Sequence, residues 1–173
     1  MIDYRIMPAA GYSKRVADVV SMLEHSRSVT LSEIQGLDQS RLDFLLDDAS
    51  NSIGALLMHV AAIEFVHTII TFEQRDLNED ERSNWGTALE LGSLAREKYR
   101  GKDLDFYVAE LDAVRRNTLD KLKEADEDWL LKDLHWENGL AYNHYWMWFH
   151  VIEDEISHRG QIKLLKRLAD RQV

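Results

Sequence analysis

The chain has 173 residues, a formal net charge of −10 and a pI near 5.1. This length is typical of one domain with its own hydrophobic core, so we expect residues 1–173 to form a single domain. The acidic balance argues against nucleic-acid partners, because affinity for phosphate backbones comes from lysine and arginine. The sequence contains no cysteine, which excludes disulfides, thiolate metal ligands and a cysteine nucleophile. Any reactive thiol must therefore come from outside the protein.

Neither a targeting segment nor a membrane-spanning helix is expected from the sequence. Residues 1–11 lack a basic segment followed by an apolar run. No stretch of about 18 consecutive apolar residues is evident either. We therefore expect a cytoplasmic protein with no membrane partner.

Helix breakers are scarce, with one proline and eight glycines in the whole chain. This scarcity favours long helices and disfavours an all-β fold, which needs many more turn residues. Apolar residues at helical spacing predict a first helix over residues 12–34, with a break or bend near 26–30. A second helix is predicted over 52–74, and because it is apolar on more than one face it should lie in the core.

The second half of the chain predicts two further long helices. Residues 75–83 are expected to be a charged loop, 85–96 a shorter helix and 103–125 a long one. The segment 126–139 is too apolar for a free linker, so we expect it to pack across one end of the fold. The last helix is predicted over 143–169. Four long helices predict an all-α, antiparallel four-helix bundle whose helix order the loop lengths leave open.

A polar row in the last helix carries the main functional signal. His150, Asp154 and His158 are each four residues apart, so they are neighbours on the helix surface and adjacent members can share a divalent cation. Such a row is also typical of a solvated face. His59 shifts the balance, because it lies in an apolar stretch where burying an unpaired imidazole costs free energy. A cation held between the two helices would pair all the ligands at once.

Two segments resemble signatures of the DinB-like metalloenzyme superfamily of bacteria. Residues 51–59, Asn-Ser-Ile-Gly-Ala-Leu-Leu-Met-His, are similar to its helix-two signature, and residues 158–162, His-Arg-Gly-Gln-Ile, to its helix-four signature. The resemblance implies a DinB-like four-helix bundle with one divalent metal ion. Members of the superfamily take one histidine from helix two and two ligands four residues apart from helix four. These positions map to His59, Asp154 and His158.

Position 154 departs from the commonest pattern of the superfamily, which has histidine there. Aspartate is a competent ligand, and the resulting set of two histidines and one carboxylate suits Zn, Ni, Fe or Mn. His150 is the substitute third ligand if Asp154 points elsewhere. Glu153 and Glu155 flank the row, and we expect them to be solvated or to contact a ligand rather than the metal.

The resemblance also implies an activity, because some relatives are S-transferases or isomerases that use bacillithiol or mycothiol. We expect a metal-dependent enzyme with a small-molecule substrate and, as a candidate second cofactor, an exogenous low-molecular-weight thiol. One alternative is a metal-dependent hydrolase in which Glu64 or Glu153 accepts a proton. Another is a noncatalytic helical stress-response or binding protein with a structural metal. Surplus apolar positions in the second and last helices, together with the relatives, predict a homodimer.

Aromatic residues gather around the start of the last helix. They could line a pocket near the metal, or they could belong to the core or to a dimer interface. The set comprises Trp136, Tyr142, Tyr145, Trp146, Trp148 and Phe149. Four further histidines have no partner that the sequence identifies, namely His25, His67, His135 and His144.

Overall fold

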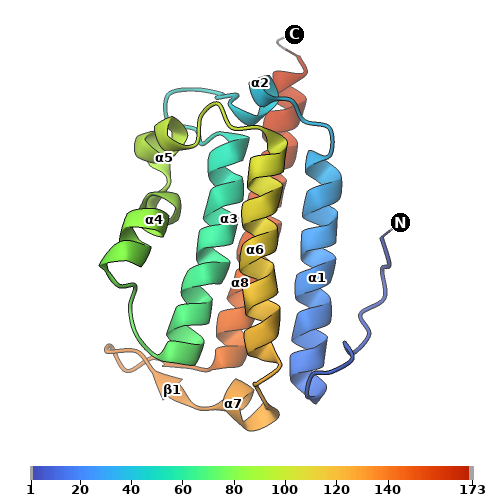
Figure 1. Ribbon diagram of the computed structural model, residues 1–173, viewed down its shortest axis with the longest axis vertical. Coiled ribbons are helices and arrows are strands. Elements are labelled where there is room, and N and C mark those ends of the chain that lie inside the picture. Colours follow the sequence, from blue (N-terminus) through green and yellow to red (C-terminus); the bar gives the residue numbers. More distant parts are fainter. Residues whose placement is uncertain (1, 172–173) are drawn as a thin grey trace.

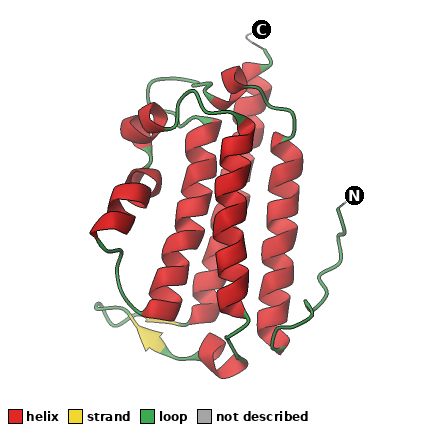
Figure 2. Ribbon diagram, viewed as in Figure 1, coloured by secondary structure: helices red, strands yellow, loops and turns green. Residues whose placement is uncertain are grey.

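The computed structural model describes residues 2–171, and helices make up most of it (Figures 1 and 2). Four long helices lie side by side along the long axis of the molecule (Figure 1). They are α1 (Lys14–Ile34), α3 (Ile53–Thr68), α6 (Leu104–Leu122) and α8 (His144–Ala169). The predicted all-α four-helix bundle is therefore confirmed.

Short elements cover one side and both ends of the bundle (Figure 2). They are α2 (Gln39–Leu42), α4 (Glu79–Glu90), α5 (Gly92–Lys98), α7 (Glu127–Leu131), β1 (Leu134–His135) and β2 (Ala141–Tyr142). The two strands form an antiparallel hairpin in which Leu134 lies opposite Tyr142. In α7, Leu130 is fully buried, and the neighbouring Trp129 stacks on Phe72. The apolar segment before the last helix thus packs across one end of the bundle, as predicted.

The long helices do not alternate in direction along the chain, as they would in the simplest antiparallel bundle. In Figure 1, α1 and α8 run upward, whereas α3 and α6 both run downward. The connection between α3 and α6 causes this arrangement, because it returns along the bundle through α4 and α5. α3 packs against both α6 and α8, and α8 also packs against α1. As antiparallel neighbours, α3 and α8 bring residues early in α3 opposite residues late in α8.

α3 continues into a π-helical turn, η1 (Ile69–Glu73), so the helical stretch ends close to the predicted boundary. The stretch Ile53–Glu73 is long and apolar enough, on average, to cross a membrane, which corrects the expectation that no such segment exists. Its most apolar window is 78% buried inside the bundle. It is therefore the central helix of the core, consistent with the burial predicted for it.

α1 is one continuous helix, so of the break or bend predicted near residues 26–30 the break does not occur. The polar residues that suggested a break, Ser26, Arg27 and Thr30, are all buried. The hydroxyl of Thr30 donates to the carbonyl of Ser26 within the same helix, at 3.1 Å. These side chains face other helices instead of interrupting their own.

The connection between α3 and α6, which we call the crossover, also differs from the prediction in where its helices begin and end. The charged segment 75–83 contains the start of α4, where Asn78 and Glu81 form a capping box that satisfies the first backbone N–H groups. Leu91 adopts a positive φ of 57° and ends this helix. The single helix predicted over residues 85–96 is therefore replaced by parts of two, α4 and α5.

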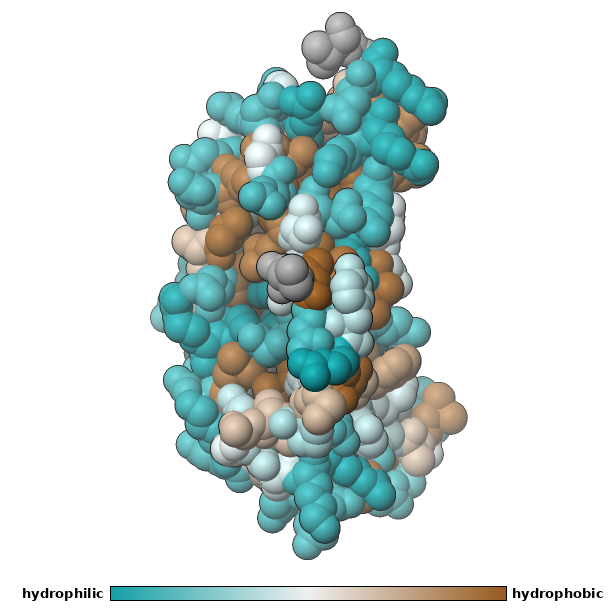
Figure 3. Space-filling view, turned by 90° about the vertical axis from the view of Figure 1, so that its right-hand side faces the viewer, coloured by the Kyte–Doolittle hydropathy of each residue, from teal (hydrophilic) through white to brown (hydrophobic). Residues whose placement is uncertain are grey.

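Residues 2–9 run along the outside of α1. The backbone N–H of Met7 donates to the hydroxyl of Ser21 at 3.2 Å, and the N–H of Ala9 donates to the carbonyl of Ala17 at 3.2 Å. Figure 3 looks onto this side of the molecule and shows apolar patches separated by hydrophilic side chains.

Candidate metal centre

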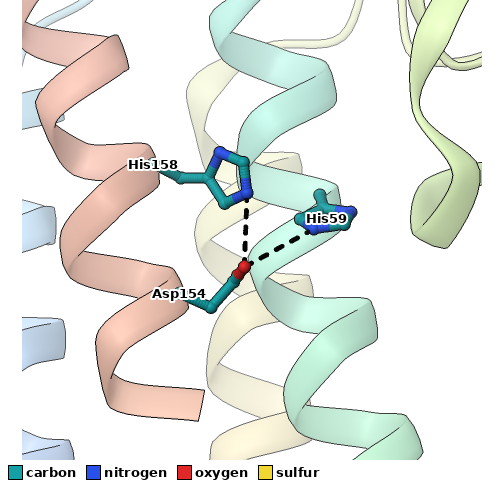
Figure 4. Close-up of side chains that lie close together, drawn as sticks. All are labelled: His59, Asp154 and His158. Carbon is teal, nitrogen blue, oxygen red and sulfur yellow. Dashed lines mark ion pairs between the residues drawn. The ribbon is translucent and has the colours of Figure 1, made fainter. Parts of the chain in front are cut away.

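The three predicted ligands lie together between α3 and α8 (Figure 4). His59 comes from α3, and Asp154 and His158 come from successive turns of α8. The Nε2 atoms of His158 and His59 lie 3.4 and 3.8 Å from Oδ1 of Asp154. One donor atom from each residue lies within 4.8 Å of the others. Donors bound to one metal at about 2.0–2.2 Å are roughly 3–4 Å apart, so this group, which we call the triad, has a spacing that one cation could bridge.

A backbone carbonyl sets the orientation of His59. Nδ1 of His59 lies 2.9 Å from the carbonyl oxygen of Ala88 in α4. Because a carbonyl oxygen can only accept, Nδ1 carries the proton and donates it, which leaves the lone pair on Nε2. Metal-binding histidines are typically held by such a second hydrogen bond. The atom free to bind a cation is thus the one that faces Asp154.

Two atoms of the triad are buried without a hydrogen-bond partner among the described residues. They are Oδ2 of Asp154 and Nδ1 of His158. Buried polar atoms are nearly always paired, because an unpaired one costs free energy. A divalent cation would neutralise the buried carboxylate, and two imidazoles with one carboxylate suit Zn, Ni, Fe or Mn. The residues present therefore fit a metal ion.

The electrostatics of the triad favour a positive charge at its centre. Burial raises the pKa of Asp154, but the adjacent imidazoles of His158 and His59 outweigh burial and hold that pKa well below its usual range. Burial lowers the pKa of His59, but the Asp154 carboxylate and the Ala88 carbonyl stabilise the protonated ring more strongly and raise the pKa above the ordinary value. The carboxylate is therefore an anion that stabilises positive charge on its neighbours, whether a proton or a metal ion supplies it.

His150, the substitute ligand, lies outside the triad. Its Nδ1 is 3.4 Å from Oε2 of the exposed Glu153, and its ring centroid is 5.6 Å from that of His67. Within residues 2–171, the triad is the one group of three potential ligands close enough to share an ion. The structure thus brings Asp154, and not His150, to the other two histidines.

The remaining histidines make local contacts. His25, His67 and His144 each place Nδ1 within hydrogen-bonding distance of a backbone carbonyl, those of Asp3, Ile63 and Trp129 respectively. His135 lies in β1. These four residues stay outside the triad.

Glu64, a candidate proton acceptor for hydrolysis, lies in a buried cluster of four charged side chains that we call the charge layer. One member comes from each long helix: Arg27, Glu64, Arg115 and Glu155. Arg115 Nε and Arg27 Nη2 donate to the two carboxylate oxygens of Glu64 at 2.7 and 2.9 Å. Burial raises the pKa of Glu64, but the two guanidinium groups outweigh it and hold the pKa below its usual range. Glu64 is therefore a paired anion and is not available as a proton acceptor.

Glu155, predicted to be solvated or to touch a ligand, is also part of the charge layer. Its Oε1 accepts from Arg27 Nε at 3.1 Å, and its side chain is 1% exposed. The sequence contains a pattern that marks these four positions. Each member stands four residues after a buried apolar residue on the core stripe of its helix: Arg27 after Leu23, Glu64 after Val60, Arg115 after Leu111 and Glu155 after Val151.

The segment 51–59 positions the start of α3 and thereby His59. The side chain of Ser52 caps the helix by accepting from the N–H of Ala55, and the Asn51 side chain accepts from the N–H of Gly92 at 3.0 Å. Gly54 allows the close approach of Tyr107 in α6, because any side chain there would collide with the phenol ring. This half of the signature therefore fixes α3 against its neighbours.

The segment 158–162 ties α8 to α1. Nη1 of Arg159 donates to the carbonyl of Ser26 at 3.0 Å, so this guanidinium joins two helices rather than facing a ligand. Ile162 is fully buried, whereas Gln161 is exposed. Around His158, the signature thus contains one ligand candidate and residues that hold its helix in place.

Comparison with known proteins adds a family to this geometry. Residues 18–171 match the family model described as Mycothiol-S-transferase. The chain belongs to the mycothiol-S-transferase family. This family is DinB-like, so the resemblance of the two signature segments is confirmed. The matched region includes all three residues of the triad, while a search of curated proteins finds no match.

Proposed function

We propose that this member of the mycothiol-S-transferase family is a metal-dependent thiol S-transferase. His59, Asp154 and His158 would bind one divalent transition metal ion, and a low-molecular-weight thiol would supply the sulfur. The observation that carries the proposal is the triad, with three donors within 4.8 Å and Nε2 of His59 left free by its bond to Ala88. Membership of a family named for mycothiol supports the thiol.

The chemistry follows from the donor set. A cation with three protein ligands keeps positions open and, as a Lewis acid, favours the thiolate form of an incoming thiol. Asp154 contributes the negative charge, Ala88 orients His59, and the low exposure of the three side chains, 11–14%, limits access of water. Because the chain has no cysteine, the attacking sulfur is external. In the transfer its S–H bond breaks and the proton passes to solvent, while the sulfur forms an S–C bond to a small-molecule electrophile whose leaving group departs with its electron pair.

The two alternatives receive less support. Hydrolysis needs a proton acceptor, and Glu64 is bonded to two arginines while Glu153 is exposed and contacts His150. A structural zinc site is closed by four protein ligands, whereas the triad supplies three among residues 2–171. An open site favours a reaction over a structural role.

We also propose that the chain acts as one domain and as a cytoplasmic homodimer. Phe149 and Ile156 are 50% and 48% exposed and lie seven residues apart, on one face of α8. That face is more than about 90° around the helix from His150 and Asp154, so a second copy could cover it without closing the triad. Sedimentation equilibrium should give a dimer mass, and Ile156→Lys should give a monomer that keeps its metal. A monomeric mass for the unaltered protein would contradict the dimer.

Cobalt substitution tests the activity directly. Adding mycothiol, bacillithiol or cysteine to the cobalt-loaded protein should produce a sulfur-to-metal charge-transfer band. The band should be lost in His158→Ala and kept in His135→Ala, a matched control because His135 lies in the exposed part of the hairpin. A spectrum that no thiol changes, together with measurable ester or amide hydrolysis, would replace the transferase with the hydrolase.

A further inference from the structure

α8 carries one row of functional side chains spaced four residues apart. The row comprises Trp146, His150, Asp154 and His158, and each step turns by only about 40° around the helix. It starts with an indole ring and ends with two members of the triad. Because α3 runs antiparallel to α8, His67 lies beside His150 at 5.6 Å between ring centroids, on the same side as the triad. The aromatic part of the row therefore begins one helical turn from Asp154.

The aromatic part continues from α8 onto the hairpin. The rings of Trp146 and His150 are parallel to within 1°, with centroids 5.4 Å apart. Trp136 meets Trp146 edge-on at 6.4 Å and stacks on Tyr142 at 3.9 Å. We call these four side chains the ring track. Contact between rings is continuous from the hairpin to the residue one turn before the triad.

Much of the ring track is open to solvent. Trp136 and Trp146 are 39% and 45% exposed, and the side chain of His150 is 37% exposed. Neighbouring exposed indoles beside a buried polar group are typical of a small-molecule site, in which apolar walls surround a few polar atoms.

A hollow adjoins the hairpin end of the ring track. Its volume is about 440 Å³, within the range of small-molecule pockets, and Trp136 and Tyr142 form part of its wall. Ile70, from the π-helical turn η1, also lines this hollow. Such π-helical turns occur frequently at functional sites. A bound molecule could therefore rest in the hollow and extend along the rings.

We propose that the ring track binds a planar aromatic or conjugated electrophile and directs its reactive carbon toward the triad. This inference rests on the proposed function and names the class of its second substrate. Aromatic rings attract one another beyond the area that they bury, so a planar ring is favoured over a saturated ring of similar size. With an aryl halide, the thiol proton passes to solvent and the S–C bond forms. The carbon–halogen bond then breaks, and the halide leaves with its electron pair.

Binding can be measured without any reaction. The protein has five tryptophans, whose indole N–H signals can be followed by NMR in the metal-loaded, isotope-labelled protein. Nitrobenzene should shift the signals of Trp136 and Trp146 saturably and leave that of Trp85 in α4 in place. Nitrocyclohexane, the saturated counterpart, should bind at least about fivefold more weakly.

Two variants of α8 sharpen this experiment. Trp146→Leu should weaken nitrobenzene binding at least about fivefold, while Trp146→Phe, which keeps a ring, should retain most of it. Leu164→Ala is the control, because Leu164 is 45% exposed on the same helix but lies off the row and away from the rings. Circular dichroism and metal content verify each fold. If Trp146→Leu does not fold, Trp146→Phe and the comparison of the two probes decide the question.

Turnover then separates this inference from the proposed function. With mycothiol as the thiol, Trp146→Leu should raise KM for 1-chloro-2,4-dinitrobenzene by a larger factor than KM for iodoacetamide, and the cobalt–thiol band should persist. Absence of that band overturns the proposed function, and the NMR result alone then decides whether the ring track is a binding site. Equal binding of nitrobenzene and nitrocyclohexane overturns the inference. So do indole signals that move with protein concentration and not with the probe, since a second copy would then cover the rings.

Discussion

Two polar regions of the bundle both include residues of α3 and α8, and they differ in whether their polar atoms have hydrogen-bond partners. In the charge layer, two arginines and two glutamates cancel in charge and pair with one another at 2.7–3.6 Å. In the triad, one carboxylate meets two imidazoles, and two polar atoms have no hydrogen-bond partner among the described residues. A closed set of buried charges serves the fold, whereas a set with unpaired atoms indicates a ligand.

Removing a triad member should have the largest effect. His158→Ala should lower the affinity for the divalent metal by about a thousandfold or more, equivalent to about 4 kcal/mol, because two donors cannot hold the ion in its place. Metal analysis of untagged protein measures the stoichiometry. Circular dichroism of the chelated protein should remain helical, since the apolar clusters form the core without the ion. Unchanged metal content in His158→Ala, or in His59→Ala, would contradict the assignment.

Substitutions at position 154 rank the candidates for the third ligand. Asp154→His should keep the metal, since it restores three imidazoles, and Asp154→Ala should weaken binding more than His150→Ala does. The opposite ranking, measured by competition with a chelator, would assign the third ligand to His150.

Opening the charge layer should affect stability rather than metal binding. Glu64→Gln leaves Arg27 and Arg115 short of a buried anion, and breaking a buried pair in this way costs about 3 kcal/mol or more. Urea unfolding measures the loss, while metal stoichiometry should stay at one. Glu24→Gln is the control, because Glu24 also pairs with Arg115 but is 52% exposed, so its loss should cost less than about 1 kcal/mol. Similar losses in both variants would contradict the distinction.

The pH dependence of stability should report His67, which lies beside His150. Burial lowers the pKa of His67 to about 4. Between pH 6.5 and 4 the unfolded chain therefore binds a proton that the folded protein does not, so stability falls as the pH drops. The loss at pH 4 should be about 3 kcal/mol, and it should be absent from His67→Gln. Parallel curves of unfolding free energy against pH for the two chelated proteins would contradict this origin.

A smaller effect should distinguish the two glycines of the signature segments. Gly54→Ala pushes a methyl group against Tyr107 and should cost about 2 kcal/mol, which thermal or urea unfolding can measure. Gly160→Ala is the control, because open space surrounds that position on α8. There alanine should stabilise the helix by up to about 1 kcal/mol. Equal effects of the two substitutions would mean that Gly54 is not required by close packing.

The sequence was sufficient for the long helices and for the grouping of the triad. Apolar spacing sets helix periodicity, and the resemblance of the two signature segments linked His59 to the pair on the last helix. Helix direction was not predictable, because it depends on the path of the crossover. The sequence predicts a break near residues 26–30 because polar residues inside a helix resemble an interruption unless their partners on other helices are known.

The charge layer is a second feature that depends on contacts between helices and could not be predicted from the sequence. Arg27 and Arg115 occupy core positions of their helices, but only the assembled bundle shows that each meets the carboxylates of Glu64 and Glu155. Leu91 illustrates a local failure, because its positive φ is unfavourable for a branched side chain and no propensity predicts it. The backbone conformation at such a position depends on tertiary packing, which here outweighs the local preference of leucine.

The hydrogen bond between His59 and Ala88 joins the metal centre to the crossover that covers it. Coupling free energies are reciprocal, so if the carbonyl in α4 favours the form of His59 that accepts a cation, the cation must in turn stabilise α4 in place. Amide hydrogens of α4 should then exchange with solvent more slowly in the metal-loaded protein, while those of α1 change little. The stability of α4 at the surface would thus depend on whether the metal is bound. A partner that displaced α4 would weaken metal binding without contacting the metal.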